Sequence, residues 1–105
     1  AYSDVSDVEI LPREYNLVQN YPNPFNPATA IKYSLAAESR VRLTIYNSIG
    51  QIVSQLINTT QGAGSYNILW NAGNIPSGVY FYSLEASSVN NNESFRSVRK
   101  MLLLK

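Results

Sequence analysis

The chain has 105 residues, no histidine and no cysteine, and eight Lys and Arg against seven Asp and Glu give a net charge of +1. This length suits one domain with a single modest core. The missing residue types exclude a disulfide framework, thiolate metal sites, a cysteine nucleophile and a histidine general base. The near-neutral charge argues against a nucleic-acid binder that depends on bulk phosphate attraction.

We expect neither a membrane-spanning segment nor a signal peptide within this sequence. The longest aliphatic run is Met101–Leu104, whereas a spanning helix needs roughly 20 apolar residues. Ala1 opens onto an acidic, serine-containing stretch without the basic and apolar regions of a secretory signal. We expect either a cytoplasmic protein or a domain cut from a longer one.

Charge divides the chain near Tyr15. Residues 1–15 carry four acids and one base, and residues 16–105 carry three acids and seven bases. The first stretch also lacks sustained periodicity. We expect residues 1–15 to be a solvated linker to something upstream, or an ordinary frayed terminus, and residues 16–105 to be the folded domain.

From Tyr15 onward, apolar and polar residues alternate with the period of two that is typical of β-strands. In one run, Ile31, Tyr33 and Leu35 alternate with two polar residues. Gly- and Asn-rich breakers separate the runs, and Gly50 is expected to supply a positive φ in a hairpin turn. The pattern predicts seven strands: Tyr15–Asn20, Ala30–Leu35, Val41–Tyr46, Gln51–Ile57, Ser65–Trp70, Val79–Ala86 and Phe95–Leu104.

Seven short strands at this spacing predict an all-β fold, an immunoglobulin-like antiparallel β-sandwich. An open barrel is the structural alternative. Trp70 is expected to be the large central residue of the core. Tyr80 follows a turn at the start of its strand, where its hydroxyl is expected to bond to backbone as a tyrosine corner.

The residues of the folded part suggest no catalytic or metal site. Serine has no histidine to activate it, and no Ser-x-x-Lys spacing replaces one. Glu38, Glu85 and Glu93 occur singly, whereas glycosidases and oxygen-ligand metal sites need grouped carboxylates. No glycine-rich phosphate loop precedes a helix. We expect no enzymatic activity, no metal and no cofactor.

Eight Tyr and one Trp raise the alternative of a carbohydrate-binding platform. Only Tyr2 and Tyr46 are clearly out of phase with the apolar side of their segments, and two scattered rings do not form a platform. Core packing explains the aromatic residues on the apolar side of their strands: Tyr33, Tyr66, Trp70, Tyr80 and Tyr82.

Three prolines stiffen one segment, which consists of Asn20, Tyr21, Pro22, Asn23, Pro24, Phe25, Asn26 and Pro27. Each proline fixes φ, lacks an N–H donor and favours extended geometry in the preceding residue. We expect a stiff crossing outside the sheets, with Phe25 as its apolar anchor under the sandwich. Tyr21-Pro22 is a candidate cis bond. A structural role is a sufficient explanation of this segment.

The C-terminus breaks the alternation, because four consecutive apolar residues lie between Lys100 and Lys105. A last strand inserted between neighbours explains this pattern. A strand offered to a partner by edge addition explains it equally. Lysines at both ends are typical of an apolar edge protected from aggregation.

The run Gln19–Thr29 closely resembles the opening signature of the type A C-terminal sorting domain of the type IX secretion system. The resemblance covers about residues 17–105 in order. One difference is Asn71-Ala72-Gly73 after Trp70, where family members often have Asp-Gly; we expect a turn variant. The other matching segments are Ile31–Tyr33, Val41–Asn47, Gly50-Gln51, Trp70, Ser77–Tyr82 and Lys100–Lys105.

The resemblance implies an immunoglobulin-like, non-catalytic export signal at the end of a large secreted protein of Bacteroidota-like bacteria. The cargo enters the periplasm by a separate N-terminal signal, crosses the outer membrane through the translocon, and stays at the cell surface or is released. The implied partners are the fused cargo, the translocon and shuttle proteins of type IX secretion, and a surface sortase-type cysteine peptidase. Cleavage is expected within residues 1–15.

The resemblance also implies which residues are recognised. The translocon is expected to recognise Lys100, Met101, Leu102, Leu103, Leu104 and Lys105. The crossing Asn20–Pro27, with Gly50, Trp70 and Gly78, is expected to have a structural or recognition role.

We hypothesise that the secretion machinery pairs with the edge of the final strand. Met101–Leu104 would supply apolar contact, and Arg96, Arg99, Lys100 and Lys105 would supply complementary charge. Two alternatives remain, a carbohydrate-binding or adhesion sandwich appended to a secreted enzyme, and a purely structural spacer.

Overall fold

Residues 12–105 are described by a computed structural model and form seven strands without a helix. None of these residues belongs to a helix that is long and apolar enough to cross a membrane. The strands are β1 (Asn16–Leu17), β2 (Ala28–Leu35), β3 (Ser39–Asn47), β4 (Ile52–Gln61), β5 (Gly64–Asn71), β6 (Gly78–Ser88) and β7 (Ser94–Leu103).

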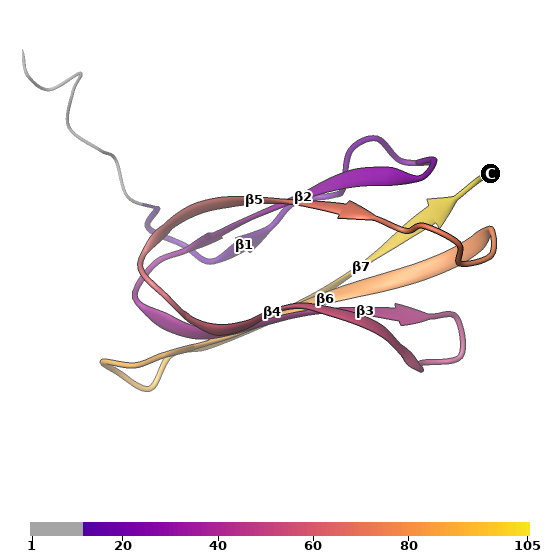
Figure 1. Cartoon of the computed structure of the whole chain (residues 1–105). Helices are drawn as coiled ribbons and strands as arrows, with labels where there is room; N and C mark the ends of the chain where they lie inside the picture. The colour runs from indigo at the N-terminus through magenta and orange to yellow at the C-terminus, as the bar shows by residue number, and fades with distance from the viewer. Residues whose placement is uncertain (1–11) are drawn as a thin grey trace, which may run out of the picture.

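The strands pack as two sheets, one layer over the other (Figure 1). The first sheet has the order β1-β2-β5, and the second has the order β4-β3-β6-β7. All neighbouring strands within the sheets are antiparallel. The prediction of an antiparallel sandwich is therefore confirmed, and the open barrel does not form.

The turn between β3 and β4 forms as the sequence predicts. Gly50 has a φ of +88°, a conformation that side chains with a Cβ avoid. The Asn47 side chain accepts hydrogen bonds from the backbone N–H groups of Ile49 and Gln51, at 3.1 and 2.9 Å. A short polar side chain and a glycine thus define the turn between two long strands.

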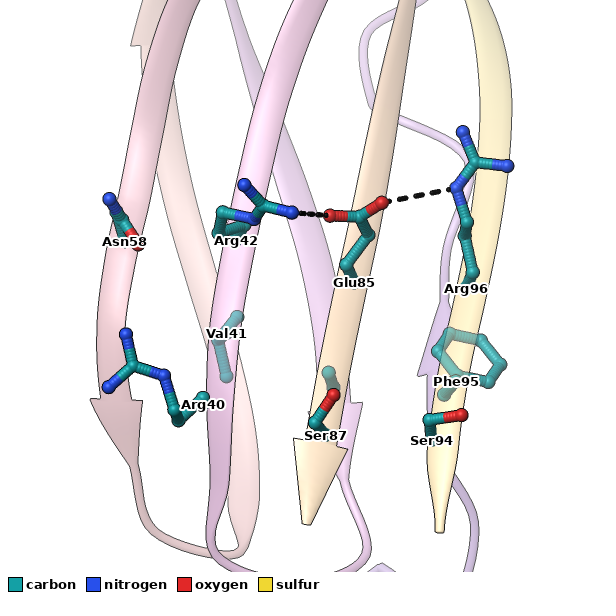
Figure 2. Close-up of a pocket in the computed structure, with 10 residues that line it drawn as sticks. Arg40, Val41, Arg42, Asn58, Glu85, Ser87, Ser94, Phe95 and Arg96 are labelled. Atoms are coloured by element: carbon teal, nitrogen blue, oxygen red, sulfur yellow. Dashed lines mark hydrogen bonds and ion pairs between the residues drawn. The ribbon is translucent and has the colours of Figure 1, made fainter. Parts of the chain in front are cut away.

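The outer face of the four-stranded sheet carries a row of charged side chains. Arg42, Glu85 and Arg96 are register partners on β3, β6 and β7. Glu85 lies between the two arginines, with oxygen–nitrogen distances of 2.8 Å to Arg42 Nη2 and 3.3 Å to Arg96 Nε (Figure 2). Because these ion pairs are exposed, each contributes at most about 1 kcal/mol. They orient the arginines more than they stabilise the fold.

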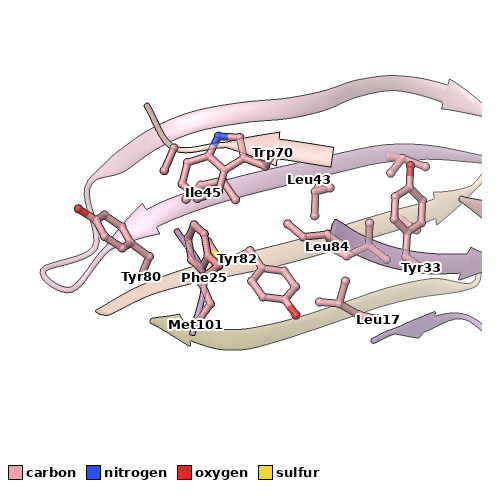
Figure 3. Packing of buried hydrophobic residues seen from close by; sticks show 14 of the residues in the cluster. Leu17, Phe25, Tyr33, Leu43, Ile45, Trp70, Tyr80, Tyr82, Leu84 and Met101 are labelled. Carbon is pink, nitrogen blue, oxygen red and sulfur yellow. The ribbon is translucent and has the colours of Figure 1, made fainter. Parts of the chain in front are cut away.

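The core lies between the two layers and is closed at one end by aromatic rings (Figure 3). Alternate residues of β2, β3 and β6 point inward, as the period-two pattern predicts. Trp70 belongs to this core, as predicted, but it lies at the end where its ring meets Phe25 and not at the centre. The buried hydrophobic residues are Leu17, Phe25, Ile31, Tyr33, Leu35, Val41, Leu43, Ile45, Trp70, Ala72, Tyr80, Tyr82, Leu84, Ala86, Met101 and Leu103.

Tyr80 forms the predicted backbone contact at the start of β6. Its hydroxyl donates a hydrogen bond to the carbonyl oxygen of Pro76, at 2.6 Å. The ring itself is buried in the core. The tyrosine corner therefore ties the turn before β6 to the interior.

The first strand is much shorter than the predicted Tyr15–Asn20. The continuous pairing with β2 covers Asn16 and Leu17, with one further backbone bond from Val18 to Lys32 and an isolated bridge from Tyr21 to Ala30. Between Val18 and Tyr21 the ladder is interrupted, because the Asn20 N–H donates to the Tyr82 hydroxyl, at 2.7 Å. The predicted strand was therefore wrong in extent, because a core tyrosine rather than a neighbouring strand receives the backbone donor.

The described chain already contacts the sandwich at Tyr15, which the expected boundary placed in the linker. Its ring stacks on Phe95 with 5.7 Å between centroids, and its hydroxyl lies 3.0 Å from Ser39 Oγ. This contact places the entry to β1 beside the starts of β3 and β7. Most of the predicted linker, residues 1–11, lies outside the described residues, and so does Tyr2.

Candidate functional site

The C-terminal segment Lys100–Lys105 divides into core and surface residues. Met101 and Leu103 are buried opposite Tyr80 and Gly78 of β6. The other four side chains are accessible, and Leu104 remains 51% exposed. On the folded domain, the predicted recognition segment therefore offers a partner the side chains of Lys100, Leu102, Leu104 and Lys105.

The proline-rich crossing covers the outer edge of the C-terminal strand. Phe25 N–H donates to the Leu102 carbonyl, and Leu104 N–H donates to the Phe25 carbonyl, both at 3.0 Å. These bonds form a parallel bridge between Phe25 and Leu103. Asn23 adds its side-chain Oδ1, which accepts the Leu102 N–H at 3.0 Å.

These contacts correct the hypothesis that a partner strand pairs with the edge at Leu102–Leu104. The backbone groups that such a strand would use are bonded to the chain's own crossing. A partner strand can add at this position only after Phe25 has left it. The last part of β7 instead lies between β6 and the crossing, as the insertion alternative predicts.

Two side chains fasten the C-terminal segment at its ends. Gln19 Nε2 donates to the Lys100 carbonyl at 2.8 Å. At the other end, the Lys105 N–H donates to Ser77 Oγ at 2.9 Å. The terminal residues thus have a fixed backbone position relative to the crossing and to the turn before β6.

Asn20 holds the crossing through buried hydrogen bonds. Its Nδ2 donates to the Pro22 carbonyl at 3.1 Å and to Thr29 Oγ1 at 2.9 Å. The Thr29 hydroxyl donates to the same Pro22 carbonyl at 2.8 Å. The Tyr82 hydroxyl, which accepts the Asn20 N–H, donates to the Val18 carbonyl at 2.8 Å. The segment without sheet pairing therefore meets its backbone bonding requirement with side chains.

Phe25 attaches the crossing to the core, as the sequence predicts. Its ring is 2% exposed and lies 5.8 Å from the Trp70 ring, centroid to centroid, at an interplanar angle of 52°. Pro27 accepts a backbone bond from Ala72 at 2.8 Å, directly after β5. The bonds preceding Pro22, Pro24 and Pro27 are all cis.

Comparison with known proteins decides the family. Residues 19–100 match the family model described as the secretion system C-terminal sorting domain. The matched residues contain the whole crossing and end on the first residue of the C-terminal segment.

This chain belongs to the C-terminal sorting domain family of the type IX secretion system.

Among solved structures, the sorting domain is similar to part of PorZ, a bacterial surface component of the type IX secretion system of Porphyromonas gingivalis. The TM-score is 0.49 at 18% sequence identity. The match covers 87% of this chain and 11% of that chain. No curated protein matches the sequence.

The remaining motif residues have structural positions in the sorting domain. Gly50 lies in the β3–β4 turn and Gly78 begins β6. Trp70 lies in β5, where its ring meets Phe25. Tyr21 differs from these residues because its side chain is 81% exposed. It is a register partner of Ala30 on the edge of the three-stranded sheet.

Sequence reasoning missed the residues that bond the crossing to the strands. Gln19, Thr29 and Tyr82 carry these contacts, and each lies outside the proline-rich run or in a distant strand. One feature of the sequence could have indicated the pairing with the C-terminal strand. Pro24 and Pro27 have no backbone N–H, whereas Phe25, which lies between them, has one that can pair with a strand.

Most tyrosines of the sorting domain serve the core, as the sequence predicts. Tyr33, Tyr80 and Tyr82 are buried, and Tyr66 stacks on Tyr33 with 5.2 Å between ring centroids. Tyr46 lies on the outer face of the other sheet, next to Phe81 in register.

Burial changes the ionisation of two of these tyrosines. It raises the pKa of Tyr33 from 10.0 to about 12; the hydrogen bond to Gln61 opposes this rise, and Tyr66 adds to it. Burial likewise raises the pKa of Tyr82, against the lowering effects of the Asn20 hydrogen bond and the Arg99 charge. Both phenols therefore favour the protonated form in the folded state.

We expect the stability of the sorting domain to fall as the pH rises from about 10 to about 12. In this range the unfolded chain loses tyrosine protons that the folded state retains, so rising pH favours unfolding. Urea denaturation across this range measures the slope. The variant Tyr33→Phe should show a shallower fall from its own lower starting value. An unchanged slope in this variant would contradict the assignment to Tyr33.

Proposed function

We propose that the folded sorting domain is recognised by the secretion machinery through the accessible side chains of its C-terminal segment, Lys100, Leu102, Leu104 and Lys105. The observation that carries this proposal is their rigid presentation. The crossing and Ser77 hold the backbone, while one leucine and two lysines extend into solvent. A fixed arrangement lowers the entropy that a partner must remove on binding.

In this proposal, the domain is a non-catalytic signal that follows its cargo through the periplasm to the cell surface or the medium. Residues 1–15 connect it to the cargo and contain the bond that a surface sortase-type cysteine peptidase cleaves. The acidic, sparsely patterned sequence of this segment supports such a role. The translocon and shuttle proteins are the partners that contact the C-terminal segment.

An export assay tests the proposal. Residues 1–105 follow a reporter with a periplasmic signal in a type IX-competent host, and reporter in the medium and at the surface is measured. The variant Leu104→Ser/Lys105→Glu changes only surface side chains. It is expected to lower exported reporter at least tenfold while the purified domain keeps its melting temperature.

A matched control changes charge elsewhere. Lys32→Glu reverses an exposed lysine on β2, in the other sheet, and should be exported like the unchanged domain. Unchanged export of Leu104→Ser/Lys105→Glu would refute recognition through the C-terminal side chains. Retention of the unchanged fusion in the periplasm would refute export by this domain in that host.

A further inference from the structure

The first half of β7 has a free edge, in contrast to its last half. Outward hydrogen bonds to Gln19 and to the crossing use the backbone of Lys100, Leu102 and Leu104. Backbone groups along a strand point to the same side at every second residue. The N–H and C=O groups of Arg96 and Val98 therefore also point away from β6.

These outward groups are without a protein partner in the described part of the chain. Beyond the ladder with β6, no hydrogen bond from residues 12–105 reaches the backbone of Arg96 or Val98. Val98 is also 47% exposed, so an aliphatic side chain is available to a partner at this edge. Exposed edges of this kind accept additional strands.

Positive charge surrounds this free edge. β7 carries Arg96, Arg99 and Lys100 and contains no acidic residue. Arg96 and Lys100 project on the outer face of the sheet, on either side of Val98. Glu85 lies between Arg96 and Arg42 and so neutralises part of the charge of the row (Figure 2). The edge remains cationic overall.

An apolar hollow lies next to the free edge on the same face. It is lined by Tyr46, Phe81, Arg96 and Val98, together with the β3–β4 turn. Thr44 and Ser83 are register partners on this face, but both are already buried and neither lines the hollow. Val98 is therefore the part of this apolar surface that the side chain of an added strand would meet.

The edge strands β4 and β5 do not combine an available edge with positive charge. β4 and β5 contain no charged residue. The pairing of β4 with β3 is also interrupted at two places by register shifts, and irregular strands are poor templates for addition. Charge therefore distinguishes β7 from the other available edges.

We propose that an extended acidic segment of a partner protein adds to β7 along Ser94–Val98. An acidic side chain of this segment lies opposite Arg96, and an aliphatic side chain lies opposite Val98 and packs against it. A second acidic residue, two positions further along the segment, faces the Lys100 side chain. The proposal rests on the proposed function, because it supplies the secretion machinery with a contact that leaves the crossing in place.

Peptide binding to the purified 105-residue domain tests the inference. The probe is a fluorescein-labelled seven-residue peptide in which four threonines alternate with glutamate, valine and glutamate, in that order. A second peptide replaces both glutamates with lysine. Fluorescence anisotropy is expected to show at least tenfold tighter binding of the acidic peptide. Equal binding of the two peptides would overturn the proposal.

Two variants separate strand addition from simple charge attraction. Val98→Pro removes an outward N–H that the β6 ladder does not use, and proline is tolerated at such edge positions. Arg96→Glu reverses the charge opposite the acidic residue without touching the core. Each is expected to weaken binding at least tenfold, whereas Lys32→Glu on the opposite sheet should leave it unchanged.

The outcomes distinguish this inference from the proposed function. Retained binding by a folded Val98→Pro or Arg96→Glu domain would overturn strand addition, whatever the export assay shows. Binding of polyphosphate without binding of the acidic peptide would identify a general polyanion surface and would also overturn it. Failure of the unchanged fusion to be exported would refute the proposed function, while peptide binding would still be measured on the purified domain.

Discussion

Replacement of Phe25 with alanine is expected to lower the free energy of unfolding by about 3–5 kcal/mol. The Phe25 ring is buried against Trp70 at one end of the core, and both neighbouring segments are stiffened by proline. Such segments cannot readily collapse into the cavity that the missing ring leaves. The loss would be a large fraction of the roughly 5–15 kcal/mol that stabilises a typical domain.

The same substitution should loosen the C-terminal strand. Phe25 exchanges backbone hydrogen bonds with Leu102 and Leu104, and its ring holds that backbone in place. Urea denaturation measures the stability, and amide hydrogen exchange at Leu104 measures the local effect. If the Leu104 amide of Phe25→Ala exchanges faster than its lower global stability accounts for, the crossing and the C-terminus are coupled.

Tyr21→Ala is the matched control within the same motif. Tyr21 is also aromatic, but its side chain is 81% exposed and its loss leaves no cavity. Its effect should stay within about 0.5 kcal/mol. Similar losses from the two substitutions would contradict the anchoring role of Phe25.

Local patterning was sufficient to predict most of the fold. The strands β2, β3 and β6 alternate so regularly that one face of each had to be apolar, and the structure buries those faces. Gly50 marked a turn because few other residues adopt its φ. These features depend on interactions within a few residues, which a single sequence contains.

The pairing of the crossing with the C-terminus depends on distant residues and was not predicted. Leu102 and Phe25 are far apart in the chain, and either the crossing or a partner strand satisfies the same backbone groups. The run Met101–Leu104 was therefore compatible both with a strand inserted between neighbours and with an edge strand for a partner, and the recognition hypothesis used the second explanation. Two of its side chains instead fill the core, and its backbone bonds within the domain.

Termination of the chain at Arg99 is expected to unfold the domain rather than to remove an export signal from a folded one. Met101 and Leu103 are both buried, and loss of either side chain alone costs about 2–5 kcal/mol. The deletion also removes the backbone groups that bond Asn23 and Phe25. The combined loss is comparable with the roughly 5–15 kcal/mol available.

Thermal unfolding measured by circular dichroism checks this expectation. The shortened chain should show no cooperative transition, whereas Leu104→Ser/Lys105→Glu should melt near the temperature of the unchanged domain. Failed export of the shortened chain would then reflect degradation of an unfolded domain, and only the surface variant would report recognition. A cooperative transition of the shortened chain near the unchanged temperature would instead show that β6 and the crossing close the core without the last strand residues.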